Sequence, residues 1–128
     1  MSEIEAILRS GKSERDDSAP VVGEAQLAAV SAQLPFPFPP SYAEFVRLGG
    51  LAELRVNHRV LAPAEVLESL SFVDLSRYVP FADNGCGDLY CWEKSNATEP
   101  PVVFADHETG KYTLEASSFV EWLRGNRF

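Results

Sequence analysis

The spacing of hydrophobic positions predicts three helices in the first 70 residues. Apolar residues recur every three or four positions between residues 24 and 34, which is the period of an amphipathic helix, and Pro35 ends it. Residues 40–48 are expected to form a second helix, with a proline in its first turn and Gly49 just beyond its end. Residues 63–70 predict a third, short helix that also opens on a proline.

Alternation with a period of two predicts the strands. Residues 54–60 alternate between apolar and polar, which is typical of a half-buried strand, but Asn57-His58 can also act as a turn that splits the segment into a hairpin. Pro80 lacks an amide donor, so its strand is expected at a sheet edge or to begin pairing after Pro80. Four later strands, forming two hairpins, are expected at residues 78–82, 88–93, 102–105 and 111–114.

The last helix is the best marked element. Ser118 and Glu121 have the spacing of a capping box, an apolar stripe begins at Phe119, and Gly125 supplies the stop. Helices therefore precede, interrupt and follow the strands. This order predicts a single-domain α+β fold, in which an antiparallel sheet of four to six strands packs with N-terminal, middle and C-terminal helices.

The core is expected in the C-terminal three quarters of the chain. Every Phe, Tyr and Trp lies at or beyond Phe36, and residues 10–20 contain nothing larger than alanine that prefers burial. Residues 1–9 can form two helical turns, which are stable only when docked. We therefore expect an N-terminal extension and linker at residues 1–20 and one domain at residues 21–128.

Charge and composition narrow the class of partner. The net charge of −8 and the pI near 4.7 argue against binding to nucleic acid or to an anionic membrane, because both need clustered Lys and Arg. An acidic surface can attract a basic protein, although it also serves ordinary solubility. The chain opens on Glu3 and Glu5 instead of a basic export signal and has no membrane-length apolar run, so a cytoplasmic protein with two free thiols is expected.

The segment from residue 79 to residue 92 allows two interpretations. Asn84-Gly85 lies between apolar runs and favours positive backbone φ, which predicts the turn of an antiparallel hairpin. Gly85 and Gly87, enclosed by Asp83 and Asp88, also have the appearance of a ligand-binding loop. The residues alone leave both interpretations open.

Motifs for metal binding and catalysis are weak. Cys86 and Cys91 lack a second Cys or His pair at zinc-site spacing, so neither metal nor cofactor is expected. His107, between Asp106 and Glu108, can be read as a general base, but three adjacent polar residues more often form a solvated turn. The sequence predicts no enzyme, and a small hydrolase using His107 is a remote alternative.

Four motifs in order resemble the SUKH superfamily. The Phe-Ala-Asp-x-Gly-x-Gly-Asp-x-Tyr run at residues 81–90 is similar to that of the family, as are residues 38–45, 101–108 and 118–123, over a match from about residue 24 to 128. The chain departs from the family pattern at two positions, where Phe38 stands for the usual Leu and Leu48 for the usual Asn.

The resemblance implies a protein-binding role. The family groups fungal cell-wall-synthesis regulators with bacterial immunity proteins, which implies a bacterial immunity protein that neutralises a cognate toxin by direct binding. A regulatory scaffold for an endogenous protein is the alternative. Acids concentrate between residues 83 and 108, and if the two hairpins are adjacent, their turns and the flanking loop at residues 95–99 can gather several carboxylates on one side. The expected contacts to a basic toxin are Asp83, Asp88, Glu93, Asp106 and Glu108, with Trp92 as an aromatic anchor.

Overall fold

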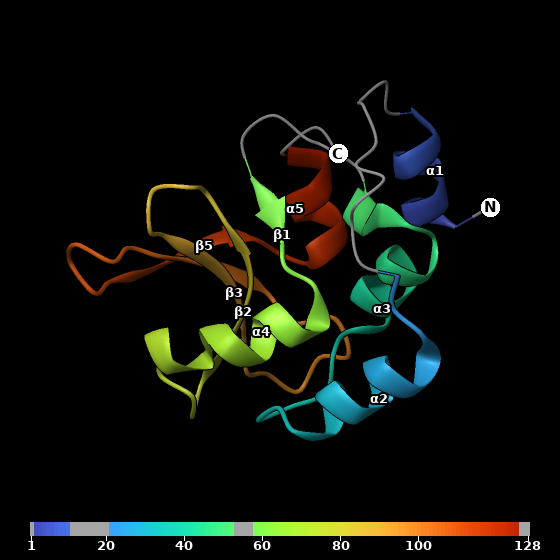
Figure 1. Cartoon of the computed structure of the whole chain (residues 1–128). Helices are drawn as coiled ribbons and strands as arrows, with labels where there is room; N and C mark the ends of the chain where they lie inside the picture. The colour runs from blue at the N-terminus through green and yellow to red at the C-terminus, as the bar shows by residue number, and fades with distance from the viewer. Residues whose placement is uncertain (1, 11–20, 53–57, 126–128) are drawn as a thin grey trace.

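A computed structural model describes residues 2–10, 21–52 and 58–125. Over these residues five antiparallel strands form one sheet in the order β1-β2-β3-β4-β5, packed with five α-helices, which confirms the expected single-domain α+β fold (Figure 1). The strands are β1 (Arg59–Val60), β2 (Tyr78–Asp83), β3 (Leu89–Glu93), β4 (Val102–Ala105) and β5 (Tyr112–Ala116).

The helices begin and end close to the positions expected from sequence. Each long segment has local signals that fix its ends, such as the proline at the start of α3 and of α4. The helices are α1 (Glu3–Ser10), α2 (Glu24–Ala32), α3 (Pro40–Arg47), α4 (Pro63–Ser69) and α5 (Phe119–Gly125), with short 3-10 turns η1 (Gly50–Ala52) and η2 (Leu70–Phe72). No helix in these parts of the chain is both long and apolar enough to cross a membrane.

Side chains cap the starts of α3 and α5. The Ser118 hydroxyl accepts a hydrogen bond of 3.2 Å from the Glu121 amide, as the capping-box spacing predicts for α5. At α3 the Glu99 carboxylate accepts a bond of 2.9 Å from the Ser41 amide and a second, short bond from the Ser41 hydroxyl. Both oxygens of the Glu99 side chain are therefore hydrogen-bonded to the first turn of α3.

The sheet buries its two faces unequally. Tyr90 and Trp92 of β3 point into the main core, to which all five α-helices contribute buried side chains (Figure 1). Leu89 and Cys91 alternate with them and belong to a smaller cluster on the opposite, second face. No α-helix in the described part of the chain contributes a residue to that cluster, which leaves the second face much less covered.

The second face is closed at one place by two stacked rings. Tyr78 of β2 and Tyr112 of β5 lie with centroids 3.8 Å apart and planes 4° from parallel. The Tyr112 hydroxyl accepts a hydrogen bond of 3.2 Å from the Asp74 amide, which fastens the segment before β2 to β5. The strands are thus joined across the sheet by side chains as well as by the ladder.

Three details of the strands differ from the sequence expectation. β1 has two residues, and residues 53–57, including the expected start of a longer strand and half of the Asn57-His58 turn, lie outside the described residues. β2 is flanked by β1 and β3, so the prediction of an edge strand is wrong, and its pairing with β3 starts before Pro80, whereas its pairing with β1 starts after Pro80. The sheet accommodates Pro80 because the register with β3 shifts between Pro80 and Ala82, and β1 pairs only with Ala82 and Asp83.

The helix at the start of the chain is docked. Ile4 is 2 % exposed and Ile7 is 7 % exposed, and both belong to the main core. Glu3 adds a surface ion pair of 3.2 Å with Arg124 of α5. The condition for a stable helix at residues 1–9 is therefore met. Of the linker expected at residues 10–20, Ser10 belongs to α1 and residues 11–20 lie outside the described residues.

Candidate functional site

Two loops meet at one edge of the sheet. Leu89 pairs with Ala105, and Ala105 pairs with Tyr112, so the loop joining β2 to β3 and the loop joining β4 to β5 are neighbours. In Figure 1 both loops project from the side of the molecule opposite α1 and α3. The connection from β3 to β4 leaves the sheet at the other end, about 13 Å away along a five-residue strand.

Turn geometry accounts for the glycines of the first loop. Gly85 has φ 77° and Gly87 has φ 96°, which are left-handed conformations that favour glycine. The Asn84 side-chain oxygen accepts bonds of 2.9 Å from the Cys86 amide and 3.2 Å from the Asp88 amide. The hairpin is therefore confirmed, but its loop of residues 84–88 is longer than the two-residue turn that Asn84-Gly85 suggests.

Asp88 and His107 join the two loops. The Asp88 carboxylate lies 2.6 Å from His107 Nδ1 and accepts a further bond of 3.0 Å from the His107 amide. Its other oxygen accepts a bond of 2.9 Å from the Asn84 side chain. These bonds, that from the His107 side chain first, lower the pKa of Asp88 to about 2.

The histidine is ordered by the same contact. The hydrogen bond to Asp88 raises the pKa of His107, so the imidazolium form is favoured. A Cβ placed on Gly87 would lie 3.2 Å from the His107 ring, so the glycine also provides the space that the ring needs. The solvated-turn interpretation missed this pair, because the partners lie 19 residues apart in different hairpins.

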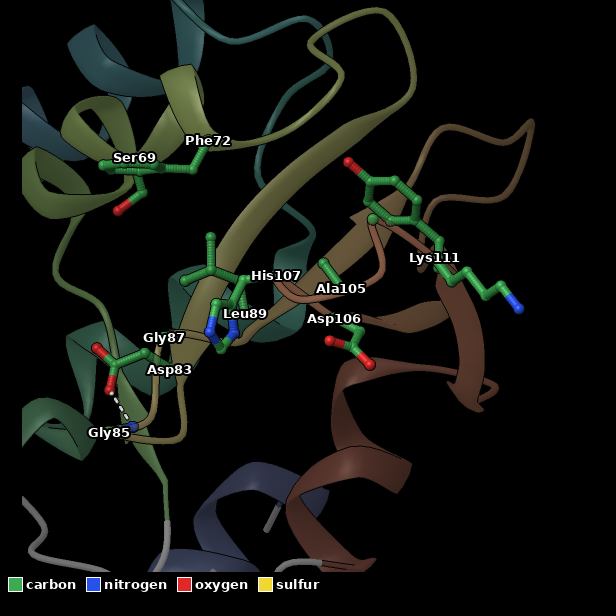
Figure 2. A pocket seen from close by; sticks show the side chains of 12 residues that line it. Ser69, Phe72, Asp83, Gly85, Gly87, Leu89, Ala105, Asp106, His107 and Lys111 are labelled. Carbon is green, nitrogen blue, oxygen red and sulfur yellow. Dashed lines mark hydrogen bonds between the residues drawn. The ribbon is translucent and has the colours of Figure 1, made fainter.

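A cleft of about 650 Å³ opens beside the two loops, on the second face of the sheet. In Figure 2 Phe72 and Ser69 lie on one side of it, Lys111 lies on the other, and Ala105, Leu89 and His107 lie between them. The lining residues are Ser69, Phe72, Asp83, Gly85, Gly87, Leu89, Ala105, Asp106, His107, Gly110, Lys111 and Tyr112. An apolar floor with a polar rim is typical of a binding surface.

Phe72 is the residue of this cleft that sequence reasoning missed. Its side chain is 78 % exposed although it is an aromatic residue at the end of η2. Leu75, 47 % exposed, follows in the same connection, and Leu114 of β5 is 69 % exposed. The available signal is the presence of two large apolar residues, Phe72 and Leu75, in the short segment between the third predicted helix and the first predicted hairpin.

The structure separates the acids that the sequence grouped. Asp83, Asp88, Asp106 and Glu108 lie at the loop edge, whereas Glu93 pairs with Tyr78 at the opposite end of β2 and β3. There Glu93 forms an ion pair of 3.3 Å with Arg77. The loop at residues 95–99 also belongs to that opposite end, so it does not join the acidic edge as expected.

The four acids at the loop edge differ in availability. Asp83 forms an ion pair of 3.0 Å with Arg59 and accepts a bond of 3.1 Å from the Gly85 amide. Asp88 uses both of its oxygens within the loops. One oxygen of Asp106 accepts hydrogen bonds from the Glu108 and Thr109 amides. The Glu108 side chain is exposed. Asp106 and Glu108 are therefore the acids best able to receive an outside cation.

The expected role of Trp92 as an anchor is wrong. Trp92 is 0 % exposed and its ring lies 4.6 Å from that of Phe81 and 5.1 Å from that of Tyr42. The alternation of β3 turns Trp92 toward the helices, where a partner has no access. The accessible aromatic residue near the loops is Phe72.

The loop edge offers ligand atoms for a cation. Asp88, Asp106 and His107 present potential metal-ligand atoms within 4.8 Å of one another, and they are the residues that can hold an ion. Both Asp88 oxygens and one Asp106 oxygen are already hydrogen-bonded, so an ion has to displace existing contacts. Both cysteines are free thiols, and burial raises the pKa of Cys91 to about 12, which makes its thiolate scarce.

Comparison with known families gives one result over most of the chain. A family model described as the SMI1 / KNR4 family (SUKH-1) matches residues 22–125. The matched range includes every strand and the loop edge with its cleft. No curated protein matches the chain.

Proposed function

Since the chain belongs to the SMI1 / KNR4 family (SUKH-1), we propose that it is an immunity protein that neutralises a cognate toxin by direct binding. Membership of this family supports a protein-binding domain of the immunity type in general. The proposed domain is not an enzyme and acts in the cytoplasm of the bacterium that makes the toxin. Inhibition then follows from occlusion of the toxin surface.

The observation that carries the choice of surface is the loop edge beside the cleft. Asp106 and Glu108 offer carboxylates with capacity for an outside cation, and the cleft beneath them has an apolar floor. A surface with a central apolar depression and a charged rim has the composition of a specific protein interface. This arrangement supports a toxin with a basic surface as the partner.

The charge of the whole chain supports the same choice. At −8 the chain attracts a basic protein over about a Debye length, roughly 10 Å at 0.1 M salt, before any contact forms. Such steering raises the association rate, which matters for an inhibitor that has to reach its toxin before the toxin reaches its target. Carboxylates on the loop edge orient the encounter.

Co-expression tests the proposal. The chain is produced together with the C-terminal domain of the large secreted protein encoded by a neighbouring reading frame, and growth and complex formation are measured. We expect the chain to restore growth and to elute with the toxin domain as a stable complex. Toxicity unchanged by the chain, or a neighbouring frame that encodes no toxin, contradicts the immunity role and favours a regulatory scaffold with an endogenous partner.

A further inference from the structure

Three large apolar side chains in the described part of the chain are exposed at the cleft or within three residues of a residue that lines it. Phe72, 78 % exposed, forms one wall, and Leu75 lies three residues further along the same segment. Leu114, 69 % exposed, lies two residues from the cleft-lining Tyr112 on β5. Exposed apolar surface that is contiguous and rimmed by polar groups marks an interaction site.

Glycines form part of the rim of the cleft. A Cβ on Gly85 or Gly110 would have no atom within 4 Å, so neither glycine is required by close packing against a neighbour. Both have positive φ, which their turns need, and their missing side chains leave the entrance free. The floor of Leu89, Ala105 and Tyr112 is thereby accessible from the loop edge.

Charged groups of both signs line the cleft, but the carboxylate oxygens left to accept a bond belong to Asp106, which lines it, and to the neighbouring Glu108. Asp106 keeps one oxygen that accepts no bond from any described residue, and the Glu108 carboxylate accepts none. The cations nearest to them are Lys111, which lines the cleft, and His107, which is held by Asp88. The two free carboxylates thus favour a positively charged group beside an apolar one.

We propose that the cleft receives one large apolar side chain from a basic segment of the toxin, with a flanking Arg or Lys held by Asp106 and Glu108. This inference rests on the proposed immunity function and specifies the chemistry of its partner. The buried anchor and the charged rim correspond to the centre and border of a hot-spot interface.

Two other occupants fit less well. A small apolar molecule inside the cleft leaves Leu75 and Leu114 uncovered, since neither lines the cavity. A second copy of this chain brings another net charge of −8, so the two copies repel one another overall. A basic protein segment covers the apolar border and satisfies the carboxylates together.

The first experiment removes the wall of the cleft. Phe72→Ser and the matched control Leu48→Ser, an exposed residue at the end of α3, are compared for their Kd with the toxin domain by calorimetry. We expect Phe72→Ser to raise Kd about tenfold or more and Leu48→Ser to leave it within about twofold. Phe72→Ser is expected to keep the melting temperature, because its side chain is 78 % exposed, whereas Leu48→Ser is expected to lower it slightly, because Leu48 is 43 % exposed.

The second experiment needs no toxin and separates this inference from the proposed function. The chain is titrated with acetyl-Arg-Phe-Arg-amide, acetyl-Glu-Phe-Glu-amide and acetyl-Arg-Gly-Arg-amide while backbone amide signals are recorded by NMR. We expect saturable shifts at Leu89, Ala105 and Tyr112 with the first peptide, and much smaller shifts with the other two.

The results distinguish the two claims. The cleft assignment is overturned if Phe72→Ser binds the toxin as well as the parent chain does and if the peptides shift other residues or all shift the same residues equally. The immunity function is unaffected by that result. Selective binding of the Arg-Phe-Arg peptide in the cleft by a chain that fails to neutralise toxin overturns the proposed function instead.

Discussion

Gly85 takes a backbone conformation that strains any residue with a Cβ. Its φ is 77° and open space surrounds the position where a Cβ would lie, so the cost of substitution is conformational rather than steric. We expect Gly85→Val to cost about 1 kcal/mol or more and to lower the melting temperature by about 4 °C. Ala97→Val, in the exposed connection from β3 to β4, is the control and should melt close to the parent chain. Equal melting curves for both variants contradict the loop geometry.

The pair formed by His107 and Asp88 makes the loop edge sensitive to pH. The pKa of His107 is raised from 6.5, so its contribution to stability is present below pH 6.5 and is lost as pH rises through the raised pKa. The pKa of Asp88 is lowered from 3.8 to about 2, so its contribution is present above pH 3.8 and is lost as pH falls toward 2. The pair therefore stabilises the fold most between about pH 4 and 6.5.

Denaturant titrations of the parent chain and His107→Gln check this window. We expect the difference in free energy of unfolding to be largest near pH 5.5 and smaller at both pH 9 and pH 2.5. At pH 9 His107 has lost its charge, and pH 2.5 lies between the unfolded and folded pKa values of Asp88, where most of its contribution is lost. A difference that does not change with pH means that the two loops are held by other contacts.

Among residues, the sequence was informative where the cause is local. The glycine in the first loop and the Ser118 cap follow from neighbours within five positions. The pair of His107 with Asp88 and the burial of Trp92 depend on which strands become adjacent and which face meets the helices. The pair and the burial are therefore determined by tertiary packing, and the neighbouring residues in the sequence do not indicate them.

At the scale of elements, α1 is part of the folded domain. Ile4 is 2 % exposed between α3 and α5, so its truncation leaves a cavity. We expect Ile4→Ala to lower the free energy of unfolding by about 2 kcal/mol or more, measured by urea titration. Ala6→Ser on the exposed side of α1 is the control. If Ile4→Ala lowers the free energy of unfolding no more than Ala6→Ser does, α1 contributes little to stability.

The helices and hairpins were predictable because each has its own stop and start signals. The boundaries of α3, α4 and β4 lie within one residue of the expected positions. The sheet order and the uncovered second face were not predictable, since a period of two assigns residues to two faces without saying which face the helices take. The cleft and Phe72 lie on that unassigned face.

At the scale of the molecule, the distribution of charge decides which variants test binding cleanly. Asp83, Asp88 and Glu93 were expected to be exposed, but each is half-buried and hydrogen-bonded or ion-paired. Reversing them disturbs the fold as well as the surface. Asp106→Asn keeps the oxygen that accepts the turn amides, and Glu108→Gln changes an exposed side chain, so this pair removes charge with little structural effect.

The association rate of the chain with the toxin domain, measured by stopped flow across a range of salt concentrations, tests the central claim most directly. If a basic toxin docks on the loop edge, Asp106→Asn/Glu108→Gln slows association several-fold at low salt, and the difference fades as salt screens the charges. The control Glu44→Gln/Glu121→Gln, which removes two charges from α3 and α5, is expected to change the rate little. If Glu44→Gln/Glu121→Gln slows association and Asp106→Asn/Glu108→Gln associates as fast as the parent chain, the interface lies on the helical side and the account is contradicted.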